Sequence, residues 1–587
     1  MSTVREATYG VLRDLGMKVI FGNPGSSELP FLKDLPSDFQ YVLALHERSA
    51  AGIALGYALA KQTAVFVNLH SIASAGNGLS AIIDAYYCHA PLVITTGQQD
   101  RRQTLAEPFL VSRAVEVVRP YVKWACEPLQ AEDVPAAIAR GYYIATQPPQ
   151  GPVFISIPMD DWNRSCAPVA TRKVTQTVSP DVAALDEVVR MLDSSRKPAL
   201  ITGPQIEQDS AWHEVIALAE HLNAYVYQDP IASRWTFPRR HRLYRGGLVP
   251  AQRPLAEQLA QHDAVLVLGA PVFLYYAYVP GDVVAPGTRL FQVTNSPFDA
   301  AAALSGASIV GNLRIAADYI CRRTRTIDRP APPPRPQPAD PIPECPITPA
   351  YLFRVLNQLL PPDAVIAEEC PSSKGDLDRY VELDEPRSFY SVRSGILGFG
   401  LPLAVGLQMG NPQRRVVCPV GDGSAQYSIQ ALWTAVQLNA PVIFIVLRNH
   451  DYSALRGFRD FTSVGPSVPG IEIPGIDEVK IAQGYGMAAI SVDRPEELEP
   501  AIRQALSAKG PMLIGVNVQK GGQTTFGMDR SVSPPNYGQL VRSSSPQKTR
   551  TRENGAQVTM ENRGRLRMRN SLLDRAMFGR TTDAVCA

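Results

Sequence analysis

Residues 416–449 read VVCPVGDGSAQYSIQALWTAVQLNAPVIFIVLRN, and this stretch decides the fold. An apolar run ends in Gly421-Asp422-Gly423, apolar positions 429, 432, 433 and 436 follow the period of a helix, and a second apolar run ends at Asn449. Strand, helix and strand in this order form a right-handed crossover between parallel strands, whose carboxyl ends open on the same edge of the sheet. The stretch therefore predicts an α/β protein in which Asp422 and Asn449 project into one crevice.

The polar residues of this crevice predict a bound cation and a diphosphate. The oxygens of Asp422 and Asn449 are hard ligands that suit Mg²⁺ or Ca²⁺, and magnesium completes its shell with phosphate and water. Gly421 and Gly423 allow a tight turn, and the amides from Ser424 onward lie at a helix N-terminus, which attracts a phosphate. The alternative is that Gly and Asp occur here only because the backbone of a strand-to-helix turn favours them.

Apolar strands alternate with amphipathic helices along most of the chain, which predicts parallel sheets covered by helices on both faces. We expect the fold class α/β, with three doubly wound parallel-sheet domains at 1–165, 181–326 and 350–520. Ten of the twenty residues at 330–349 are proline, which predicts an extended linker at 327–349. The strands are expected at 19–21, 41–45, 64–69, 92–95, 153–157, 198–203, 224–229, 264–271, 289–295, 364–369, 415–420, 441–447 and 512–518.

The last section, 521–587, loses the apolar period and is rich in Arg, Gly, Ser and Thr, so we expect a disordered basic tail. Residues 530–587 hold 11 Lys and Arg against 4 Asp and Glu, which leaves 46 against 51 for the rest of the chain. The net charge of +2 therefore reflects the tail and not a basic groove, and we expect no nucleic-acid partner.

Other features of the sequence favour a cytoplasmic protein without a membrane partner. The longest strongly apolar run, 264–274, is shorter than the about 20 residues of a membrane-crossing helix. Residues 1–16 carry charges where a signal peptide needs an apolar stretch. The eight cysteines form no C-x-x-C pair, which argues against a disulfide framework and a structural zinc site.

Gly421-Asp422-Gly423 with an Asn 27 residues after the Asp resembles the signature of thiamine-diphosphate enzymes. Four further stretches resemble the benzoylformate decarboxylases: FGNPGSSELPFLK at 21–33, ALHERSAAGIALGYALA at 44–60, NLHSIASAGNGLSAI at 68–82 and GILGFGLPLAVG at 395–406. The similarity covers roughly residues 5–520. It implies a pyrimidine-binding domain, a middle domain and a diphosphate-binding domain, in that order. It also implies a homotetramer built from dimers, with active sites between two chains.

The resemblance also assigns the site residues. It implies thiamine diphosphate and Mg²⁺ (or Ca²⁺), with the metal bound by the side chains of Asp422 and Asn449 and the backbone carbonyl of Asp451. Glu47 would activate the cofactor, Ser26 would bind the substrate carboxylate, and His70 would transfer protons. The other implied cofactor contacts are Gly395 through its carbonyl, Leu397 as the prop that bends the cofactor, and Gly421, Gly423, Ser424, Ser372 and Tyr452. The implied substrate pocket includes Tyr276, Ser391 and Phe458.

The three residues assigned to catalysis also have simpler alternative roles. Glu47 follows an apolar strand and opens a helix, and an acidic residue stabilises a helix N-terminus wherever it occurs. Ser26 follows Pro24-Gly25, and its alternative role is that of a helix cap. His70 follows an apolar strand, where a histidine is often structural.

The substrate end departs from the family at three places. Tyr276 stands where the family has a second active-site histidine, SVRSG at 391–395 replaces an aromatic and small apolar residues, and Pro371 removes one amide donor near the cofactor. We expect thiamine-diphosphate- and Mg²⁺-dependent, non-oxidative decarboxylation of a 2-oxo acid, with benzoylformate as the leading substrate. One alternative is a carboligase that forms 2-hydroxy ketones, as in acetolactate synthase chemistry. The other is a non-catalytic relative that keeps the fold.

Overall fold

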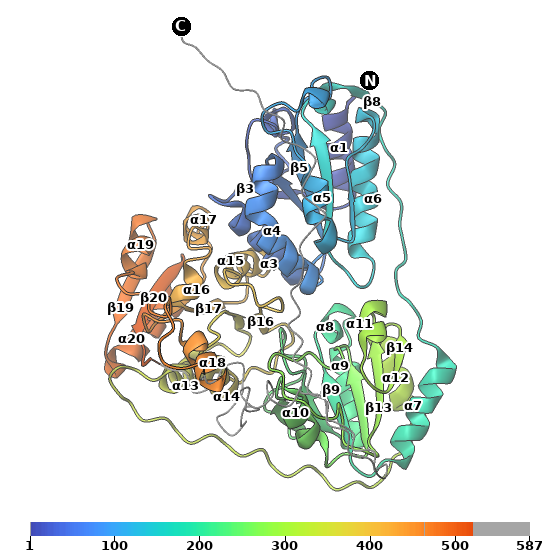
Figure 1. The fold of residues 1–587 in the computed structure, drawn as a ribbon, viewed down its shortest axis with the longest axis vertical. Helices are drawn as coiled ribbons and strands as arrows, with labels where there is room; N and C mark the ends of the chain where they lie inside the picture. The colour runs from blue at the N-terminus through green and yellow to red at the C-terminus, as the bar shows by residue number, and fades with distance from the viewer. Residues whose placement is uncertain (1, 463, 521–587) are drawn as a thin grey trace, which may run out of the picture. The chain divides into compact units, whose positions relative to one another are not determined.

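The computed structural model describes residues 2–462 and 464–520 (Figure 1). The predicted disordered tail at 521–587 lies outside these residues. The described part contains three six-stranded sheets in which every strand is parallel to its neighbours. The prediction of three doubly wound α/β domains is therefore confirmed, whereas the exact domain bounds stay predictions.

The first sheet has the strand order β3-β2-β4-β5-β7-β6. Alternate residues of its central strands point to opposite faces: Phe66 packs with α1 and α6, whereas Val65 and Val67 pack with α3 and α4. Both faces are thus covered, as the continuous apolar strands require. The bounds are β2 Val19–Asn23, β3 Gln40–Leu43, β4 Val65–Leu69, β5 Leu92–Gln98, β6 Trp124–Cys126 and β7 Val153–Pro158, with α1 Val4–Asp14, α2 Leu29–Leu32, α3 Glu47–Lys61, α4 Ser71–Tyr87, α5 Ala114–Val118 and α6 Val134–Thr146.

The second sheet has the order β11-β10-β9-β12-β13-β14. Leu266 and Leu268 pack with α7, α9 and α12, while Val265 and Val267 pack with α10 on the other face. The bounds are β9 Pro198–Thr202, β10 Tyr225–Gln228, β11 Tyr244–Gly247, β12 Ala264–Leu268, β13 Arg289–Thr294 and β14 Ala307–Val310, with α7 Val182–Ser194, α8 Gln205–Gln208, α9 Trp212–Leu222, α10 Gln252–Leu259, α11 Pro297–Ala302 and α12 Leu313–Arg323. Between α12 and α13 the proline-rich segment forms no helix or strand.

The third sheet has the order β16-β15-β17-β18-β20-β19. Val417 and Ile445 pack with α13 and α20, while Val416 and Phe444 lie on the opposite face with α15 and α17. The bounds are β15 Val365–Glu368, β16 Phe389–Ser391, β17 Val416–Gly421, β18 Ile443–Arg448, β19 Ala488–Val492 and β20 Met512–Asn517, with α13 Pro349–Leu359, α14 Lys374–Tyr380, α15 Gly400–Gly410, α16 Asp422–Ala425, α17 Ala431–Gln437, α18 Ser453–Thr462, α19 Glu478–Gly484 and α20 Pro495–Ser507.

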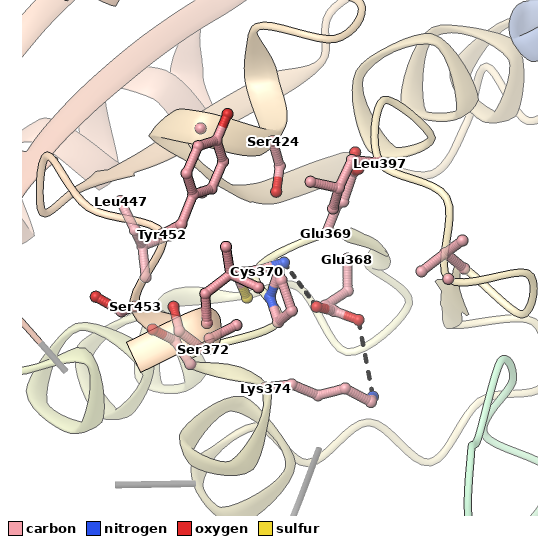
Figure 2. Close-up of a pocket in the computed structure, with 18 of the residues that line it drawn as sticks. Glu368, Glu369, Cys370, Ser372, Lys374, Leu397, Ser424, Leu447, Tyr452 and Ser453 are labelled. Atoms are coloured by element: carbon pink, nitrogen blue, oxygen red, sulfur yellow. Dashed lines mark hydrogen bonds and ion pairs between the residues drawn. The ribbon is translucent and has the colours of Figure 1, made fainter. Parts of the chain in front are cut away.

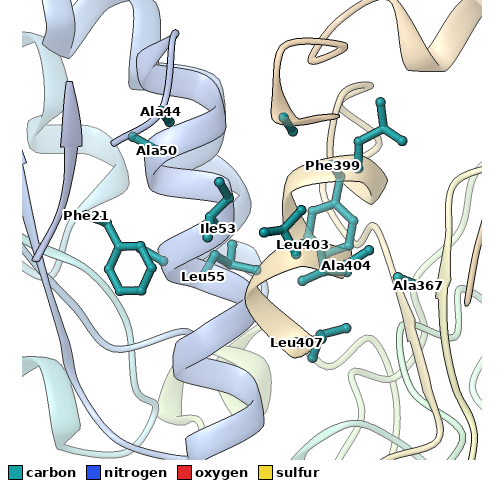
Figure 3. Packing of buried hydrophobic residues seen from close by; sticks show 14 of the residues in the cluster. Phe21, Ala44, Ala50, Ile53, Leu55, Ala367, Phe399, Leu403, Ala404 and Leu407 are labelled. Carbon is teal, nitrogen blue, oxygen red and sulfur yellow. The ribbon is translucent and has the colours of Figure 1, made fainter. Parts of the chain in front are cut away.

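The helices α3 and α15 join the first and third domains into one hydrophobic core. Figure 3 shows Ile53 and Leu55 of α3 beside Leu403 and Leu407 of α15. Two glycines bring the backbones together, because a Cβ on Gly56 would lie 2.3 Å from the carbonyl oxygen of Leu403. A Cβ on Gly406 would lie 2.0 Å from the carbonyl oxygen of Ile53, so neither position admits a larger residue without a shift of backbone.

Two details differ from the sequence expectations. The helix expected after Gly423 is split into α16 and α17, with a turn at 426–430 between them. Seven strands were not expected. Five of them, β6, β11, β14, β16 and β19, lie at an edge of a six-stranded sheet, and the other two, β1 Ser2–Thr3 and β8 Ser165–Cys166, pair with each other. Among the helices of the described residues, none combines the length and apolar character needed to cross a membrane.

Candidate functional site

The carboxyl ends of β17 and β18 bring Asp422 and Asn449 together. Gly421 at the end of β17 pairs with Leu447 of the neighbouring β18, so both strands end at the same edge. One carboxylate oxygen of Asp422 accepts from the backbone N–H of Asn449 at 3.0 Å and from that of His450 at 2.6 Å. The predicted juxtaposition of these two strand ends is thus present.

The donor atoms at this edge fit a hard divalent cation. Asp422 is 3% exposed, and burial raises the pKa of its carboxyl group even though backbone N–H groups donate to it. The side chain of Asp451 pairs with Arg456, which leaves its backbone carbonyl as the ligand that the resemblance implies. Within residues 2–462 and 464–520, no group of three His, Cys, Asp or Glu side chains is arranged to hold a metal. A cation here would therefore depend on mixed oxygen ligands, as Mg²⁺ and Ca²⁺ accept.

A second carboxyl group near Asp422 was not expected from the sequence. Glu478 at the start of α19 is fully buried, and its Oε1 accepts from Gln426 at 3.3 Å. Burial raises the pKa of Glu478 to about 7, and the charge of Asp422 adds to this effect. A divalent cation would stabilise the negative charge of these two buried carboxyl groups, Asp422 and Glu478.

One pocket of about 350 Å³ extends from this edge and is shown in Figure 2. It collects nearly all residues that the sequence assigned to the cofactor, the metal and the substrate. Those that line it are Tyr276, Ser372, Ser391, Gly395, Leu397, Gly421, Asp422, Gly423, Ser424, Asn449, Asp451, Tyr452 and Phe458. They come from β16, β17, α16, α18 and the loops that follow β15, β16 and β18, apart from Tyr276, which comes from the middle domain.

The loop that carries Gly395 and Leu397 is held from two sides. Gly395 has φ 79°, a backbone conformation that favours glycine, and a Cβ at this position would meet no atom within 4 Å. Arg48 of α3 donates to the carbonyl oxygen of Leu397 at 3.0 Å. Glu369 accepts from the N–H groups of Gly398 and Gly400, and burial raises the pKa of Glu369 to about 8. The first domain therefore takes part in shaping this loop of the pocket.

Glu47 begins α3, but its carboxylate does not cap that helix. The cap position is His46, whose ring accepts from the N–H of Arg48. The Glu47 carboxylate instead accepts from Ser74 at 2.6 Å and Asn77 at 3.0 Å, both on α4. Burial raises its pKa, but the hydrogen bonds from Ser74, the backbone and Asn77 outweigh this and lower the pKa overall. The geometry argues against the helix-cap alternative.

His70 lies at the end of β4, where its Nδ1 is 2.8 Å from Ser27 Oγ and 2.9 Å from Glu28 Oε2. Gly25 is required beside it, because a Cβ there would lie 2.2 Å from the imidazole ring. Ser26 is exposed and caps no helix, since the cap position of α2 is Glu28. The sequence did not predict Ser27 and Glu28 as partners of His70, although they immediately follow the assigned Ser26.

Ser26, Glu47 and His70 do not line the pocket around Asp422. The structure of one chain thus presents two separate groups of assigned residues. Thirteen surround the pocket of the third domain. The other three lie at the strand ends and helix starts of the first domain.

The substrate end of the pocket combines aromatic and polar residues. The rings of Tyr276 and Phe458 lie 5.4 Å apart, edge to face. Ser391 Oγ donates to Glu368 at 2.5 Å, and Glu368 and Lys374 line the same pocket without having been expected there. Arg393, the charged residue of the SVRSG stretch, lies 3.9 Å from Asp229 and does not line the pocket.

Comparison with known proteins matches three parts of the chain to one family. Residues 2–114 match the N-terminal TPP binding domain of thiamine pyrophosphate enzymes, residues 185–320 the central domain and residues 372–516 the C-terminal TPP binding domain. The chain belongs to the thiamine pyrophosphate enzymes. The prediction of thiamine diphosphate as the cofactor is thereby confirmed.

Several members of this family are similar over almost their whole length. Benzoylformate decarboxylase from Pseudomonas aeruginosa is 42% identical over 525 residues, which cover 88% of this chain and 99% of that protein. Two solved structures each have a TM-score of 0.87 and 39% identity: 4-hydroxybenzoylformate decarboxylase from Rhodococcus jostii, with 89% of this chain and 100% of that chain covered, and benzoylformate decarboxylase from Polynucleobacter necessarius, with 89% and 99% covered. Acetolactate synthase large subunit from Haemophilus influenzae is only 25% identical. The prediction of a thiamine-diphosphate-dependent 2-oxo-acid decarboxylase of the benzoylformate decarboxylase type is confirmed.

Proposed function

We propose that the enzyme decarboxylates an aromatic 2-oxo acid of the benzoylformate type to the aldehyde and carbon dioxide. The observation that carries this proposal is that the residues assigned to metal, cofactor and aromatic substrate line one pocket. The relatives named for benzoylformate and 4-hydroxybenzoylformate support the aromatic acyl group.

In this proposal Asp422, Asn449 and the backbone carbonyl of Asp451 bind Mg²⁺ (or Ca²⁺), which holds the diphosphate of the cofactor. The amides at the start of α16, near Ser424, add further donors for the phosphate. Bound thiamine diphosphate supplies an electron sink, which stores the electron pair left on the carbonyl carbon when carbon dioxide departs. Leu397 orients the cofactor at the loop that Arg48 supports.

We propose that the first domain of a second chain completes each site. Glu47, Ser26 and His70 lie away from the pocket of their own chain, and catalysis by them requires contact with a cofactor. A homotetramer built from dimers, with active sites between chains, meets this requirement. Glu47 then activates the cofactor, and Ser26, whose side chain is exposed in one chain, binds the substrate carboxylate.

His70 is arranged to exchange a proton with the substrate. Its Nδ1 faces Ser27 and the buried Glu28, so a proton on Nδ1 satisfies this carboxylate. The other ring nitrogen is then free of that contact and serves as the acid or base toward the reacting carbon. Glu28 thus fixes the ring and its tautomer in this account.

A carboligase reaction is the second candidate, and Tyr276 favours it. This phenol lines the pocket where a histidine is expected, and burial raises its pKa above the ordinary value near 10. It exchanges protons at neutral pH less readily than an imidazole. Slower proton transfer from this residue to the reacting carbon would leave time for an added aldehyde to react there instead, which would give a 2-hydroxy ketone.

The activity test is incubation of the pure enzyme with thiamine diphosphate, Mg²⁺ and a panel of aromatic and aliphatic 2-oxo acids, with carbon dioxide and carbonyl products followed. We expect turnover of the aromatic acids, whereas consumption of aliphatic acids alone would contradict the proposal. Shared sites are tested by co-expression of Glu47→Gln and Asp422→Ala chains. Each variant alone is expected to be nearly inactive, and the mixed assembly regains activity only if Glu47 of one chain serves Asp422 of another.

The unpaired cysteines support the proposed cytoplasmic location. Seven cysteines of the described residues are free thiols, and most of them are buried. Proteins of oxidising compartments more often use cysteines as disulfides.

A further inference from the structure

Ser74 of α4 forms a side-chain hydrogen bond to a residue of another helix. Its Oγ donates to Glu47 Oε1 of α3 at 2.6 Å, and Ser74 is 1% exposed. A serine inside a helix often bonds to a carbonyl oxygen one turn earlier in its own helix, so this partner is not the usual one. Figure 1 shows α3 and α4 side by side in the first domain. The contact between the two helices therefore includes a short hydrogen bond to the residue assigned to cofactor activation.

The backbone of Ser74 contacts a second assigned residue. Its N–H donates to the carbonyl oxygen of His70 at 2.9 Å, and His70 is the cap position of α4. Ser74 is thus hydrogen-bonded through its backbone to the residue assigned to proton transfer and through its side chain to Glu47. The first turn of α4 therefore fixes the distance between these two residues.

The direction of the Glu47 carboxylate is set mainly by α4. Asn77 Nδ2, also on α4, donates to Oε2 at 3.0 Å, and Asn23 at the end of β2 donates to Oε1 at the longer distance of 3.3 Å. Glu47 is 7% exposed, and its titratable neighbour is His46, which precedes it in the chain. The three side-chain donors are uncharged, so Ser74 and Asn77 orient the carboxylate without neutralising it.

We propose that Ser74 is a positioning residue for cofactor activation, because it holds the Glu47 carboxylate in one direction toward the cofactor. A catalytic group that is displaced from its productive geometry loses much of its effect on the rate, even when it is still present. A hydroxyl donor also favours the ionised form of the carboxyl group that it contacts. Ser74 acts through Glu47 and does not have to touch the cofactor. This inference rests on the proposed function, in which Glu47 activates the cofactor bound by a second chain.

The test measures exchange of the cofactor C2 proton by NMR and the dissociation constant of thiamine diphosphate, with Mg²⁺ present, by calorimetry. Ser74→Ala should slow exchange by about tenfold or more, as the loss of a hydrogen bond to a charged group predicts, and should change the dissociation constant by less than about twofold. Ser80→Ala removes a serine hydroxyl from the same helix and is the matched control. It should change neither quantity.

A double-mutant cycle tests whether Ser74 acts through Glu47. In the Glu47→Gln background, Ser74→Ala should slow exchange no further, because the carboxylate that it positions is absent. Independent losses that multiply in the double variant would refute the inference.

The apoprotein gives a readout that needs no cofactor. Carbon NMR follows the ionisation of the glutamate carboxyl groups, and Glu47→Gln identifies the signal of Glu47. Because the Ser74 hydroxyl favours the ionised carboxylate, Ser74→Ala should move the ionisation of Glu47 to higher pH. An unmoved titration would show that the hydrogen bond does not act on the carboxylate and would overturn the inference.

The outcomes separate this inference from the proposed function. If Glu47→Gln slows exchange and Ser74→Ala does not, the inference is wrong and the function stands. If Glu47→Gln leaves exchange unchanged, the role of Glu47 in the proposed function is wrong, and the inference falls with it. Equal losses of exchange rate and cofactor affinity in Ser74→Ala would indicate a general disturbance of the site and would also overturn the inference. Should Ser74→Ala fail to fold, Asn77→Ala, at an exposed residue, is the second variant and should slow exchange in the same way.

Discussion

Replacement of Arg48 by alanine should weaken cofactor binding, although Arg48 is not expected to touch the cofactor. Its guanidinium is 2.7 Å from Asp84 on α4 and donates to the carbonyl oxygen of Leu397 at 3.0 Å. Both ends of the ion pair are buried, with side-chain exposures of 5% and 2%. Asp84 also accepts from Ser394, so the pair holds the loop on both sides of Gly395.

The buried contacts of Arg48 give the size of two effects, one on the stability of the fold and one on the affinity for the cofactor. Loss of one partner of a buried ion pair costs about 3–5 kcal/mol, because the other charge stays buried and unpaired. Burial already raises the pKa of Asp84, which shows how poorly this site tolerates a lone carboxylate. The lost hydrogen bond to Leu397, from a charged donor, is worth about 1.5–3 kcal/mol. If the loss of this hydrogen bond leaves the loop disordered until the cofactor binds, binding must supply the energy that orders it. Cofactor affinity then falls by about 10- to 150-fold, at 1.4 kcal/mol per factor of ten.

The assay is fluorescence or calorimetric titration with thiamine diphosphate and Mg²⁺, together with urea unfolding of the apoprotein. Arg240→Ala is the matched control, because Arg240 is 59% exposed and forms a surface pair with Asp384. It should cost at most about 1 kcal/mol and leave affinity unchanged. The reasoning is refuted if Arg48→Ala is destabilised as expected but binds the cofactor with wild-type affinity, since the pair would then support the fold and not the loop.

Four further predictions concern the site. Asp422→Ala should abolish binding of thiamine diphosphate, and a chelator should do the same to the wild type; equal calorimetric affinity with and without chelator would contradict the metal assignment. Glu47→Gln should leave binding largely intact and slow exchange of the cofactor C2 proton by NMR, and an unchanged exchange rate would remove Glu47 from activation. Because the pKa of Glu369 is raised from 4.5 to about 8, the folded state holds a proton that the unfolded state releases, so stability should fall as pH rises between these values. Urea unfolding should show this slope in the wild type and a smaller one in Glu369→Gln. Tyr276→His should raise aldehyde release relative to 2-hydroxy ketone formation when an aldehyde is supplied, and an unchanged product ratio would make Tyr276 a passive part of the wall.

The sequence predicted the central strands of each sheet because these strands are buried on both faces and read as continuous apolar runs. Five of the missed strands are edge strands of the large sheets, and four of these have partly exposed residues, such as β11 with the sequence YRGG and β14 with ASIV. Half-exposed strands lack the apolar run on which the expectation depended. The prediction of a single helix after Gly423 was wrong for another reason, because its apolar positions are divided between a turn and α17.

The site also divides into residues that a sequence pattern predicted and residues that no pattern indicated. Asp422 and Asn449 could be placed because each directly follows a strand, and parallel strands bring their carboxyl ends to one edge. Glu368 and Lys374 were missed because neither follows a recognisable pattern, and they meet only when α14 folds back beside β15. Glu478 approaches Asp422 across 56 residues of chain, a distance that no local pattern spans.

The close contact of α3 with α15 has a consequence for engineering. Gly56 and Gly406 each face the backbone of the opposite helix, so the two helices form a matched pair. A chimera that takes residues 1–165 from one homologue and the rest from another would combine helices that were never fitted to each other. Recombination of these enzymes should therefore exchange α3 and α15 together, and libraries that place breakpoints between them should be depleted of folded members unless both parents carry glycine at these two positions.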